Sequence, residues 1–166
     1  SGKEGQFVIS GSQSFLLHHK ISQSLAGRVA ILILLPFSLR ELNQAQIKTD
    51  QLEQLIFTGF YPRIYDKKID PLDFYPNYLQ TYIERDVRSL KNIQQLDSFT
   101  RFLKLCAGRV GKLLNLSALA NDCGISVTTA KGWLSILQAS YIVYLLHPHF
   151  KNFNKRLVKM PKLYFY

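Results

Sequence analysis

Apolar and polar residues recur at helical spacing after Ser126, and they form two stripes. The apolar stripe contains Ala130, Trp133, Leu134 and Leu137. The other stripe is polar and cationic, and it contains Thr128, Lys131, Ser135 and Gln138. Ser126 is a good N-cap, because its hydroxyl can accept a hydrogen bond from a free amide of the first helical turn. The pattern therefore predicts a helix over residues 126–139 with one buried face and one solvent-facing face.

The segments around this helix predict a compact motif. Residues 116–124 have the pattern of a short helix, and Gly124 suits the left-handed position that ends a helix. Residues 141–146 and 156–166 have the pattern of two strands on either side of a basic loop. A helix, a tight turn, a second helix and a two-stranded wing together have the layout of a winged helix-turn-helix.

The N-terminal part has the pattern of a parallel sheet with helices. Apolar strands are predicted at 6–12 and 29–35, and a helix is predicted over 15–25. Continuous apolar runs with helices between them favour a parallel sheet that is covered on both faces. Two strands are too few for a stable sheet of this kind, so we expect part of the sheet to be absent from this sequence. Further helices are predicted at 38–42 and 51–58.

A connecting region and the start of the C-terminal core follow. Residues 59–76 are rich in Pro, Tyr and Asp and are predicted to form a loop, and residues 78–93 are predicted to form a helix. Asp97 or Ser98 caps the next predicted helix. Its core stripe contains Phe99, Phe102, Leu103 and Cys106. We therefore predict a mainly α fold with a small β part (α+β).

The positive charge of the chain is concentrated in its last third. The formal net charge is +10, and residues 99–166 hold ten Lys and Arg residues against one acid, Asp122. A basic field confined to the segment with the helix-turn-helix pattern is typical of a module that binds a polyanion. The alternative is a solvated surface that keeps the chain soluble. The coincidence of charge and motif favours nucleic acid.

The sequence offers no pattern typical of a membrane span, a metal site or a catalytic site. Its longest apolar run, residues 29–35, is far shorter than the roughly 18 residues that a transmembrane helix needs. The start resembles no signal sequence, so we expect a cytoplasmic protein without a membrane partner. Cys106 and Cys123 have no Cys or His partners at metal-ligand spacing and are expected to be reduced core thiols.

Seven short segments resemble those of one family, in the same order and with similar spacing. They are 7–13 (FVISGSQ), 24–29 (SLAGRV), 35–41 (LPFSLRE), 59–62 (GFYP), 82–87 (YIERDV), 114–120 (LNLSALA) and 159–165 (KMPKLYF). The family consists of AAA-type P-loop ATPases of bacteria and archaea, whose C-terminal half is an uncharacterised domain that starts with a winged helix. The resemblance covers essentially the whole chain.

This resemblance implies that the chain is part of a larger ATPase. Such ATPases hold ATP and Mg²⁺ with a Gly-rich loop that ends in Lys-Ser/Thr. No Gly-x-x-x-x-Gly-Lys-Ser/Thr occurs here, so we expect a C-terminal remainder that is inactive alone, with ATP and Mg²⁺ bound only by the full-length protein. The implied domains are a remnant of the P-loop α/β domain (1–58), a connecting loop and helix (59–96) and a winged helix-turn-helix (97–166).

The resemblance also implies candidate nucleotide-sensing residues. Ser10 or Ser12 matches the polar residue that senses the γ-phosphate at the end of a core strand. Arg28 matches an arginine that the family keeps where it could reach a phosphate, including one in a neighbouring subunit. Each has a simpler alternative, because the serines can form a strand-end turn and Arg28 can form a surface ion pair.

The winged-helix pattern predicts a nucleic-acid site. The second helix of such a motif enters the major groove, and the wing lies over the backbone or the minor groove. Near the start of that helix, the residues predicted to face base edges or phosphates are Thr128, Thr129 and Lys131. In the wing, the predicted phosphate contacts are Lys151, Asn152, Asn154, Lys155 and Arg156.

Two functions stay open at this point. The first is a DNA-binding module that anchors the ATPase on DNA, and the second is a protein-interaction or self-assembly module without nucleic-acid binding. Trp133 is predicted to lie in the core because it belongs to the apolar stripe. The aromatic residues predicted to pack the wing strands, and not to stack on bases, are Tyr141, Tyr144, Tyr164 and Phe165.

Overall fold

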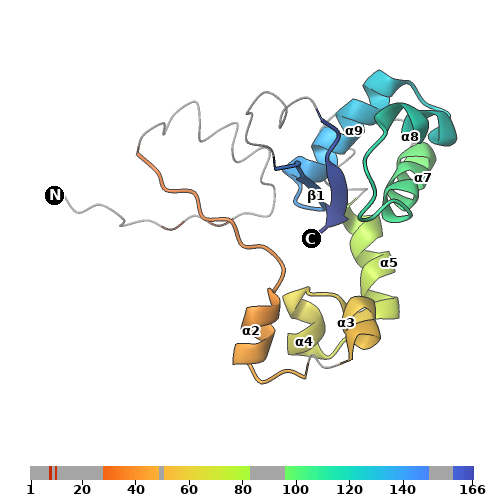
Figure 1. The fold of residues 1–166 in the computed structure, drawn as a ribbon. Helices are drawn as coiled ribbons and strands as arrows, with labels where there is room; N and C mark the ends of the chain where they lie inside the picture. Colours follow the sequence, from red (N-terminus) through yellow and green to blue (C-terminus); the bar gives the residue numbers. More distant parts are fainter. Residues whose placement is uncertain (1–7, 9, 11–27, 49–50, 83–95, 150–158) are drawn as a thin grey trace. The chain divides into compact units, whose positions relative to one another are not determined.

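The computed structural model describes residues 8, 10, 28–48, 51–82, 96–149 and 159–166 (Figure 1). The chain divides into two compact units, Ser1–Leu32 and Ile33–Tyr166, and every described helix and strand lies in the second unit. The fold is mainly α-helical with one small antiparallel sheet, as the sequence predicts. The described elements are α2 (Leu39–Gln44), α3 (Leu52–Thr58), α4 (Pro62–Lys67), α5 (Pro71–Tyr82), α7 (Leu96–Ala107), α8 (Leu116–Cys123), α9 (Val127–Ala139), β1 (Val143–Leu146) and β2 (Lys162–Phe165).

The start of α2 is fixed by a capping box. The Ser38 hydroxyl accepts a hydrogen bond from the Glu41 amide at 3.3 Å, and the Glu41 carboxylate accepts one from the Ser38 amide at 2.8 Å. Because the hydrogen bonds from Ser38 favour the ionised form, they lower the pKa of Glu41. The predicted helices at 38–42 and 51–58 are confirmed by α2 and α3.

Residues 29–35 differ from their prediction as a buried strand. In the structure they belong to neither a helix nor a strand, and their side chains are exposed, with Leu32 and Leu34 at 90% and 97%. A strand needs a partner for its backbone N–H and C=O groups, and the two described strands pair with each other. The strand prediction at 29–35 is therefore wrong for this structure. The predicted helix over 15–25, and residues 6–12 apart from 8 and 10, lie outside the described residues.

Residues 59–76 were predicted to form a loop, but they contain α4 and the first half of α5. Both helices begin at a proline, Pro62 and Pro71. Proline is favourable at this position, since its fixed φ suits the helix and its missing N–H would have no acceptor within the helix. α5 begins well before the predicted start at residue 78, and the part of that prediction beyond Tyr82 lies outside the described residues.

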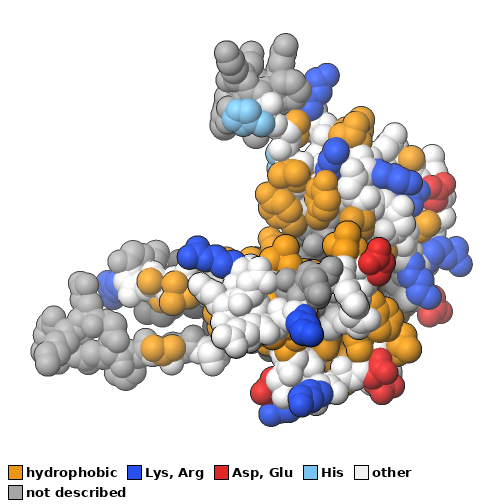
Figure 2. Space-filling model, turned by 60° about the horizontal axis from the view of Figure 1, so that its bottom comes forward, with side chains coloured by type: hydrophobic (Ala, Val, Ile, Leu, Met, Phe, Trp, Pro, Cys, Tyr) orange, Lys and Arg blue, Asp and Glu red, His pale blue; other side chains and the backbone are white. Residues whose placement is uncertain are grey.

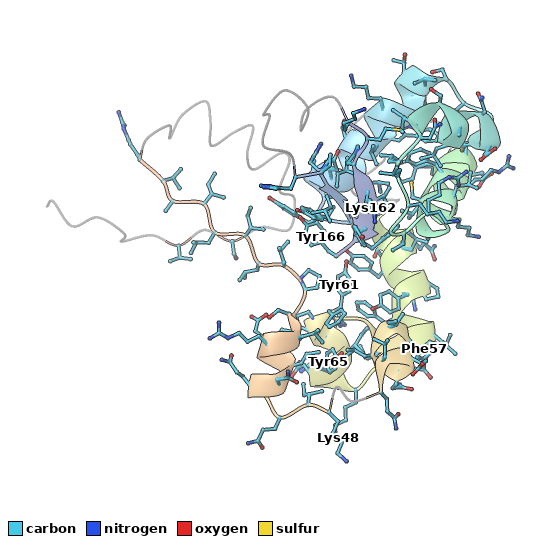
Figure 3. The ribbon with its side chains drawn as sticks, in the orientation of Figure 1. Lys48, Phe57, Tyr61, Tyr65, Lys162 and Tyr166 are labelled. Atoms are coloured by element: carbon cyan, nitrogen blue, oxygen red, sulfur yellow. The ribbon has the colours of Figure 1, made fainter. Side chains whose placement is uncertain are left out.

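An aromatic cluster packs α5 against the start of α4. The Tyr61 ring lies 4.8 Å from the Tyr78 ring and 5.5 Å from the Phe74 ring, measured between centroids. The Tyr61 hydroxyl donates to the Tyr78 hydroxyl at 3.1 Å. Burial raises the pKa of Tyr61, which is labelled in Figure 3, above its ordinary value of 10.0. The Tyr75 hydroxyl donates to the Thr58 carbonyl at 2.9 Å. The residues that make these contacts lie far apart in sequence, which explains why a local sequence pattern did not predict them.

The main core lies between α7, α8, α9 and the sheet. The Trp133 ring packs against the Phe99 and Phe102 rings at 5.3 and 5.5 Å, both edge to face. Tyr82 of α5 joins this core. The predicted stripes of α7 and α9 are confirmed, because the residues buried on them are Phe99, Phe102, Leu103, Cys106, Ala130, Trp133, Leu134, Ile136 and Leu137. Burial of such aromatic and aliphatic side chains contributes roughly 1.5–3 kcal/mol each.

Both cysteines lie in this core as free thiols, as predicted. Burial raises the pKa of Cys106 to about 12, and it also raises the pKa of Cys123. A thiol that is buried and protonated reacts slowly with oxidants and alkylating agents. Within the described part of the chain, no three His, Cys, Asp or Glu residues lie close enough to hold a metal ion.

The sheet follows directly after α9. β1 and β2 are antiparallel, and their register pairs Val143 with Phe165 and Leu146 with Lys162. A third segment, residues 110–114, lies along the other edge of β2. The Gly111 amide donates to the Leu163 carbonyl at 2.8 Å, and the Leu114 amide donates to the Pro161 carbonyl at 2.8 Å. This third segment was absent from the sequence prediction.

Hydrophobic side chains also occur on the surface. Figure 2 shows several of them on the face that it presents, among Lys and Arg side chains. Exposed examples on α3 and α5 are Leu52, Ile56, Phe57 and Leu72. Across the helices that the structure describes, none has the length and apolar character needed to cross a membrane.

Candidate nucleic-acid interface

α8 and α9 are joined by a tight turn whose geometry is set by Gly124. This glycine has a φ of 73°, in the left-handed region that suits the residue after a helix. Two hydrogen bonds close the end of α8, since the Gly124 amide donates to the Asn121 carbonyl at 3.1 Å and the Ile125 amide donates to the Ala120 carbonyl at 3.0 Å. The predicted helix, turn and helix are therefore confirmed as local structure.

The start of α9 is fixed by Ser126. Its hydroxyl accepts a hydrogen bond from the Thr129 amide at 3.0 Å, and it lies 2.8 Å from the Thr129 hydroxyl. Thr129 is half-buried and its hydroxyl is engaged with the cap, whereas Thr128 and Lys131 are exposed. Of the three residues predicted on this helix, Thr128 and Lys131 are thus the better placed for an external ligand.

The solvent-facing side of α9 is polar from Lys131 onward. Lys131, Ser135 and Gln138 are exposed, and the opposite side of the helix is buried in the core. The Ser135 hydroxyl donates to the Lys131 carbonyl at 2.9 Å and so stays close to the helix surface. The helix therefore offers a cationic side chain and small polar groups, next to Val127, which is exposed at its start.

Asp122 is the single acidic residue of positions 99–166, and its carboxylate is neutralised by an ion pair. Asp122 of α8 forms an ion pair with Arg109, which also donates to the Leu105 carbonyl at 3.0 Å. Exposed Lys and Arg side chains in this part of the structure are Arg101, Lys104, Lys112, Lys131, Lys159 and Lys162. An excess of exposed cations over acids gives this surface a positive potential.

The other predicted site residues divide into two groups. Ser10 and Arg28 are exposed and lie outside helices and strands. Ser12 lies outside the described residues, and so do the predicted wing contacts Lys151, Asn152, Asn154, Lys155 and Arg156. Their roles stay predictions.

Sequence reasoning missed one feature of this surface, the pairing of residues 110–114 with β2. A signal was present, because Gly108 and Gly111 bracket a short segment with the apolar residue Val110. Gly111 has a φ of 75°, which explains the glycine at that position. Such a short edge segment has no periodicity that would identify it without its partner strand.

Two family models match this chain, one after the other. A model described as "AAA domain" matches residues 1–43, and a model described as "Domain of unknown function (DUF8612)" matches residues 49–166. An AAA domain followed by an uncharacterised domain is the order that the resemblance implies. The matches give no description of a winged helix.

Two curated relatives are similar over nearly the whole chain. They are uncharacterized protein Mb2031c of Mycobacterium bovis and uncharacterized protein Rv2008c of Mycobacterium tuberculosis. Each is 29% identical over 161 residues, which is 96% of this chain and 35% of the relative. The chain thus spans about a third of the length of these relatives. No solved structure matches it.

Proposed function

The chain belongs to the family described as Domain of unknown function (DUF8612), and we propose that its C-terminal part is a winged helix-turn-helix that binds duplex DNA. The observation that supports this most is the pair α8 and α9. A tight turn at Gly124 joins them, and the second helix has a buried apolar face and an exposed face with Thr128 and Lys131. A helix presented in this way fits the major groove, with residues of its N-terminal half toward the bases.

The sheet supports the same proposal. In a winged helix, strands follow the second helix and their connection forms the wing. Here β1 follows α9 directly, β2 pairs with it, and residues 110–114 extend the sheet on the other side of β2. The connection between β1 and β2 contains Lys151, Lys155 and Arg156 in sequence, and we assign to these residues and to Asn152 the contacts with phosphates.

The charge distribution supports binding through phosphates. Residues 99–166 contain a single acid, which is paired with Arg109. Each Lys or Arg that neutralises a phosphate releases a condensed counterion, so affinity falls as the salt concentration rises. A steep salt dependence is therefore the expected signature of this surface.

We also propose that the chain is part of an AAA-type ATPase, with domains at 1–58, 59–96 and 97–166. The AAA domain match at residues 1–43 supports this assignment. In the full-length protein ATP and Mg²⁺ would be the cofactors, and Ser10, Ser12 and Arg28 would sense the nucleotide. This sequence contains no Gly-x-x-x-x-Gly-Lys-Ser/Thr, so the chain alone is expected to lack ATPase activity.

A second candidate function is contact with another protein, including self-association. Its support is the exposed apolar surface of α3 and α5, where Leu52, Ile56 and Leu72 are each more than half exposed. Exposed apolar patches on soluble proteins often mark protein interfaces. The two functions differ in their salt dependence. As the salt concentration rises, contacts with phosphates weaken, whereas contacts between apolar surfaces stay unchanged or strengthen.

The test of the proposed function is fluorescence anisotropy of a labelled duplex titrated with the 166-residue chain at several salt concentrations. We expect a Kd of about 1–100 μM with a steep salt slope, which is the range of electrostatic DNA binding. Lys131→Ala should weaken binding and reduce the salt slope by about 1, because it removes one phosphate or base contact. Arg156→Ala should do the same if the wing assignment holds.

Lys48→Ala is the matched control, since it removes the same charge from an exposed lysine outside α7–α9 (Figure 3). It should leave the affinity and the salt slope unchanged. Equal losses in Lys48→Ala and Lys131→Ala would reduce the effect to net charge and contradict a site on α9. Absence of binding at low salt, together with concentration-dependent association in sedimentation, would favour the protein-contact function instead.

A further inference from the structure

The sheet has one face toward the core and one face toward solvent. Val143 and Leu163 are buried in the core, so their neighbours along each strand point to the opposite face. Tyr144 and Tyr164 are directly paired across the two strands, and both belong to this outer face. Tyr144 is 45% exposed, so part of its ring is accessible to solvent.

The tyrosines of the outer face form a cluster. The Tyr166 ring lies 5.9 Å from the Tyr144 ring and 6.2 Å from the Tyr141 ring, both edge to face. Tyr166 is 36% exposed. The pattern of the sequence predicts that Tyr141, Tyr144 and Tyr164 pack the strands and do not stack on bases, yet the structure leaves ring surface accessible on this face. We call Tyr141, Tyr144, Tyr164 and Tyr166 the tyrosine face.

Lysines border the tyrosine face. Lys162 is exposed at the first position of β2, and it pairs with Leu146 of β1 and with Leu113 of the third segment. Lys162 is the first residue of β2, and Tyr166 directly follows its last residue, Phe165 (Figure 3). Lys112 is exposed beside β2, where its carbonyl accepts a hydrogen bond from the Leu163 amide at 3.4 Å.

Within the described residues of 99–166, no unpaired acidic side chain lies near the face. The acid of residues 99–166, Asp122, is ion-paired with Arg109. The combination of exposed aromatic rings with bordering cations is complementary to a chain that carries flat bases and phosphates. Protein interfaces are also enriched in tyrosine but depleted in lysine, so the bordering lysines favour nucleic acid over a protein partner.

We propose that the tyrosine face binds single-stranded nucleic acid. Bases would stack on the rings of Tyr144 and Tyr166, and a phosphate would contact the Lys162 amine. Stacking needs an accessible base face, and in a duplex those faces are covered by neighbouring base pairs, so the ligand is a single strand. This site uses side chains of the sheet, whereas the proposed duplex site uses Thr128 and Lys131 of α9.

The test is anisotropy of a labelled single-stranded oligothymidylate titrated with the chain at low and moderate salt. Tyr144→Leu with Tyr166→Leu keeps the apolar character of the face but removes both rings. We expect this double variant to bind roughly 5- to 150-fold more weakly for each base that loses its stacking partner. Tyr144→Phe with Tyr166→Phe keeps both rings and should bind like the unmodified chain.

Two further variants separate this site from folding and from the duplex site. Lys162→Gln leaves the rings in place, and it should weaken oligothymidylate binding and lower its salt dependence even if the leucine variant is poorly folded by circular dichroism. Lys131→Ala should bind oligothymidylate normally while its duplex binding falls. If the unmodified chain binds oligothymidylate but no duplex, the function proposed for α9 is contradicted and the tyrosine face is not.

Three results would overturn the inference. The first is no binding of oligothymidylate to the unmodified chain at low salt. The second is equal binding by the leucine and phenylalanine variants, because it would mean that the rings do not stack on bases. The third is self-association of the chain in sedimentation equilibrium that disappears in the leucine variant, since this would assign the tyrosine face to a second copy.

Discussion

Gly59 and Gly124 both follow a helix and both have a positive φ, of 68° and 73°. Their surroundings differ. A Cβ on Gly124 would meet nothing within 4 Å, whereas a Cβ on Gly59 would collide with the Tyr75 hydroxyl. That hydroxyl donates to the Thr58 carbonyl at 2.9 Å, so the ring cannot move away without losing a hydrogen bond. A side chain at position 124 would therefore meet backbone strain alone, whereas a side chain at position 59 would meet both backbone strain and a steric clash.

We predict that Gly124→Ala lowers the free energy of unfolding by about 1–2 kcal/mol, the cost of a left-handed conformation for a residue with a Cβ. Gly59→Ala should cost more, because the cost of a strained backbone adds to the displacement of Tyr75. Urea denaturation followed by circular dichroism measures both. Gly108→Ala is the control, since its φ is not positive and its Cβ would be an ordinary 3.8 Å from the Leu105 carbonyl. A Gly108→Ala effect as large as that of Gly124→Ala would contradict the backbone explanation.

At this scale the sequence predicted Gly124 but not Gly59. Gly124 ends a helix whose start and apolar residues are adjacent in sequence, so its role follows from a local pattern. The constraint on Gly59 comes from Tyr75, which belongs to another helix. The same difference applies to the site residues. Exposure of Lys131 follows from the periodicity of α9, whereas exposure of Tyr144 depends on strand register.

Helix α9 was predicted from its cap Ser126 and its apolar stripe, α8 from its pattern and the glycine that ends it, and α7 from its apolar stripe. The predicted cap of α7 at Asp97 or Ser98 is wrong, because α7 begins at Leu96 and both residues lie inside it. Residues 59–76 were predicted as a loop because Pro, Tyr and Asp are common in loops. The structure places Pro62 and Pro71 at helix starts, and the aromatic cluster of Tyr61, Phe74 and Tyr78 supplies packing that the composition did not reveal. For residues 29–35 the error is the reverse, because a strand was predicted and the structure has none there. Apolar content indicates a strand, but a strand forms only where it can pair with another strand.

α5 contains one residue that opposes its helical structure, Pro76. A proline inside a helix removes one hydrogen bond to the carbonyl four residues earlier and crowds that turn. The Asn77 side-chain amide donates to the Asp73 carbonyl at 2.8 Å in the same turn. We predict that Pro76→Ala raises the free energy of unfolding by about 1–2 kcal/mol, which is less than the roughly 3 kcal/mol difference in helix propensity because the proline also restricts the unfolded chain.

Thermal and urea unfolding of the Pro76→Ala variant would measure this gain. Pro76 is exposed, so the substitution leaves the packing of the aromatic cluster unchanged. Asn77→Ala is a useful companion, because it should cost stability in the presence of Pro76 and less in its absence. A decrease in stability on Pro76→Ala would mean that the proline fixes a bend in α5 which the packing of Tyr78 and Tyr82 requires.

For the whole molecule, the sequence located the basic region and the order of the helices, and the structure added how the chain divides. The chain divides into its two compact units between residues 32 and 33, inside the exposed apolar segment 29–35. The charge asymmetry follows from a count of residues, and it needed no coordinates. The tyrosine face needed them, because no pattern in the sequence reveals which side of a short sheet faces solvent.

Exposure of residues 29–35 leads to a prediction about the whole chain. Proteases cut segments that are accessible and lack helix or strand hydrogen bonds. Leu32 and Leu34 are the most exposed leucines of this segment, and chymotrypsin cleaves after leucine. We predict that limited chymotrypsin digestion cuts first after Leu32 or Leu34, and that mass spectrometry finds a product extending from there to Tyr166. Because this product retains the complete core of α7–α9 and the sheet, it should unfold cooperatively and bind duplex DNA with the same salt slope as the intact chain. Early cuts inside α7–α9 would instead mean that the core depends on residues 1–32 for its stability. DNA binding at Lys131 would then require the intact chain.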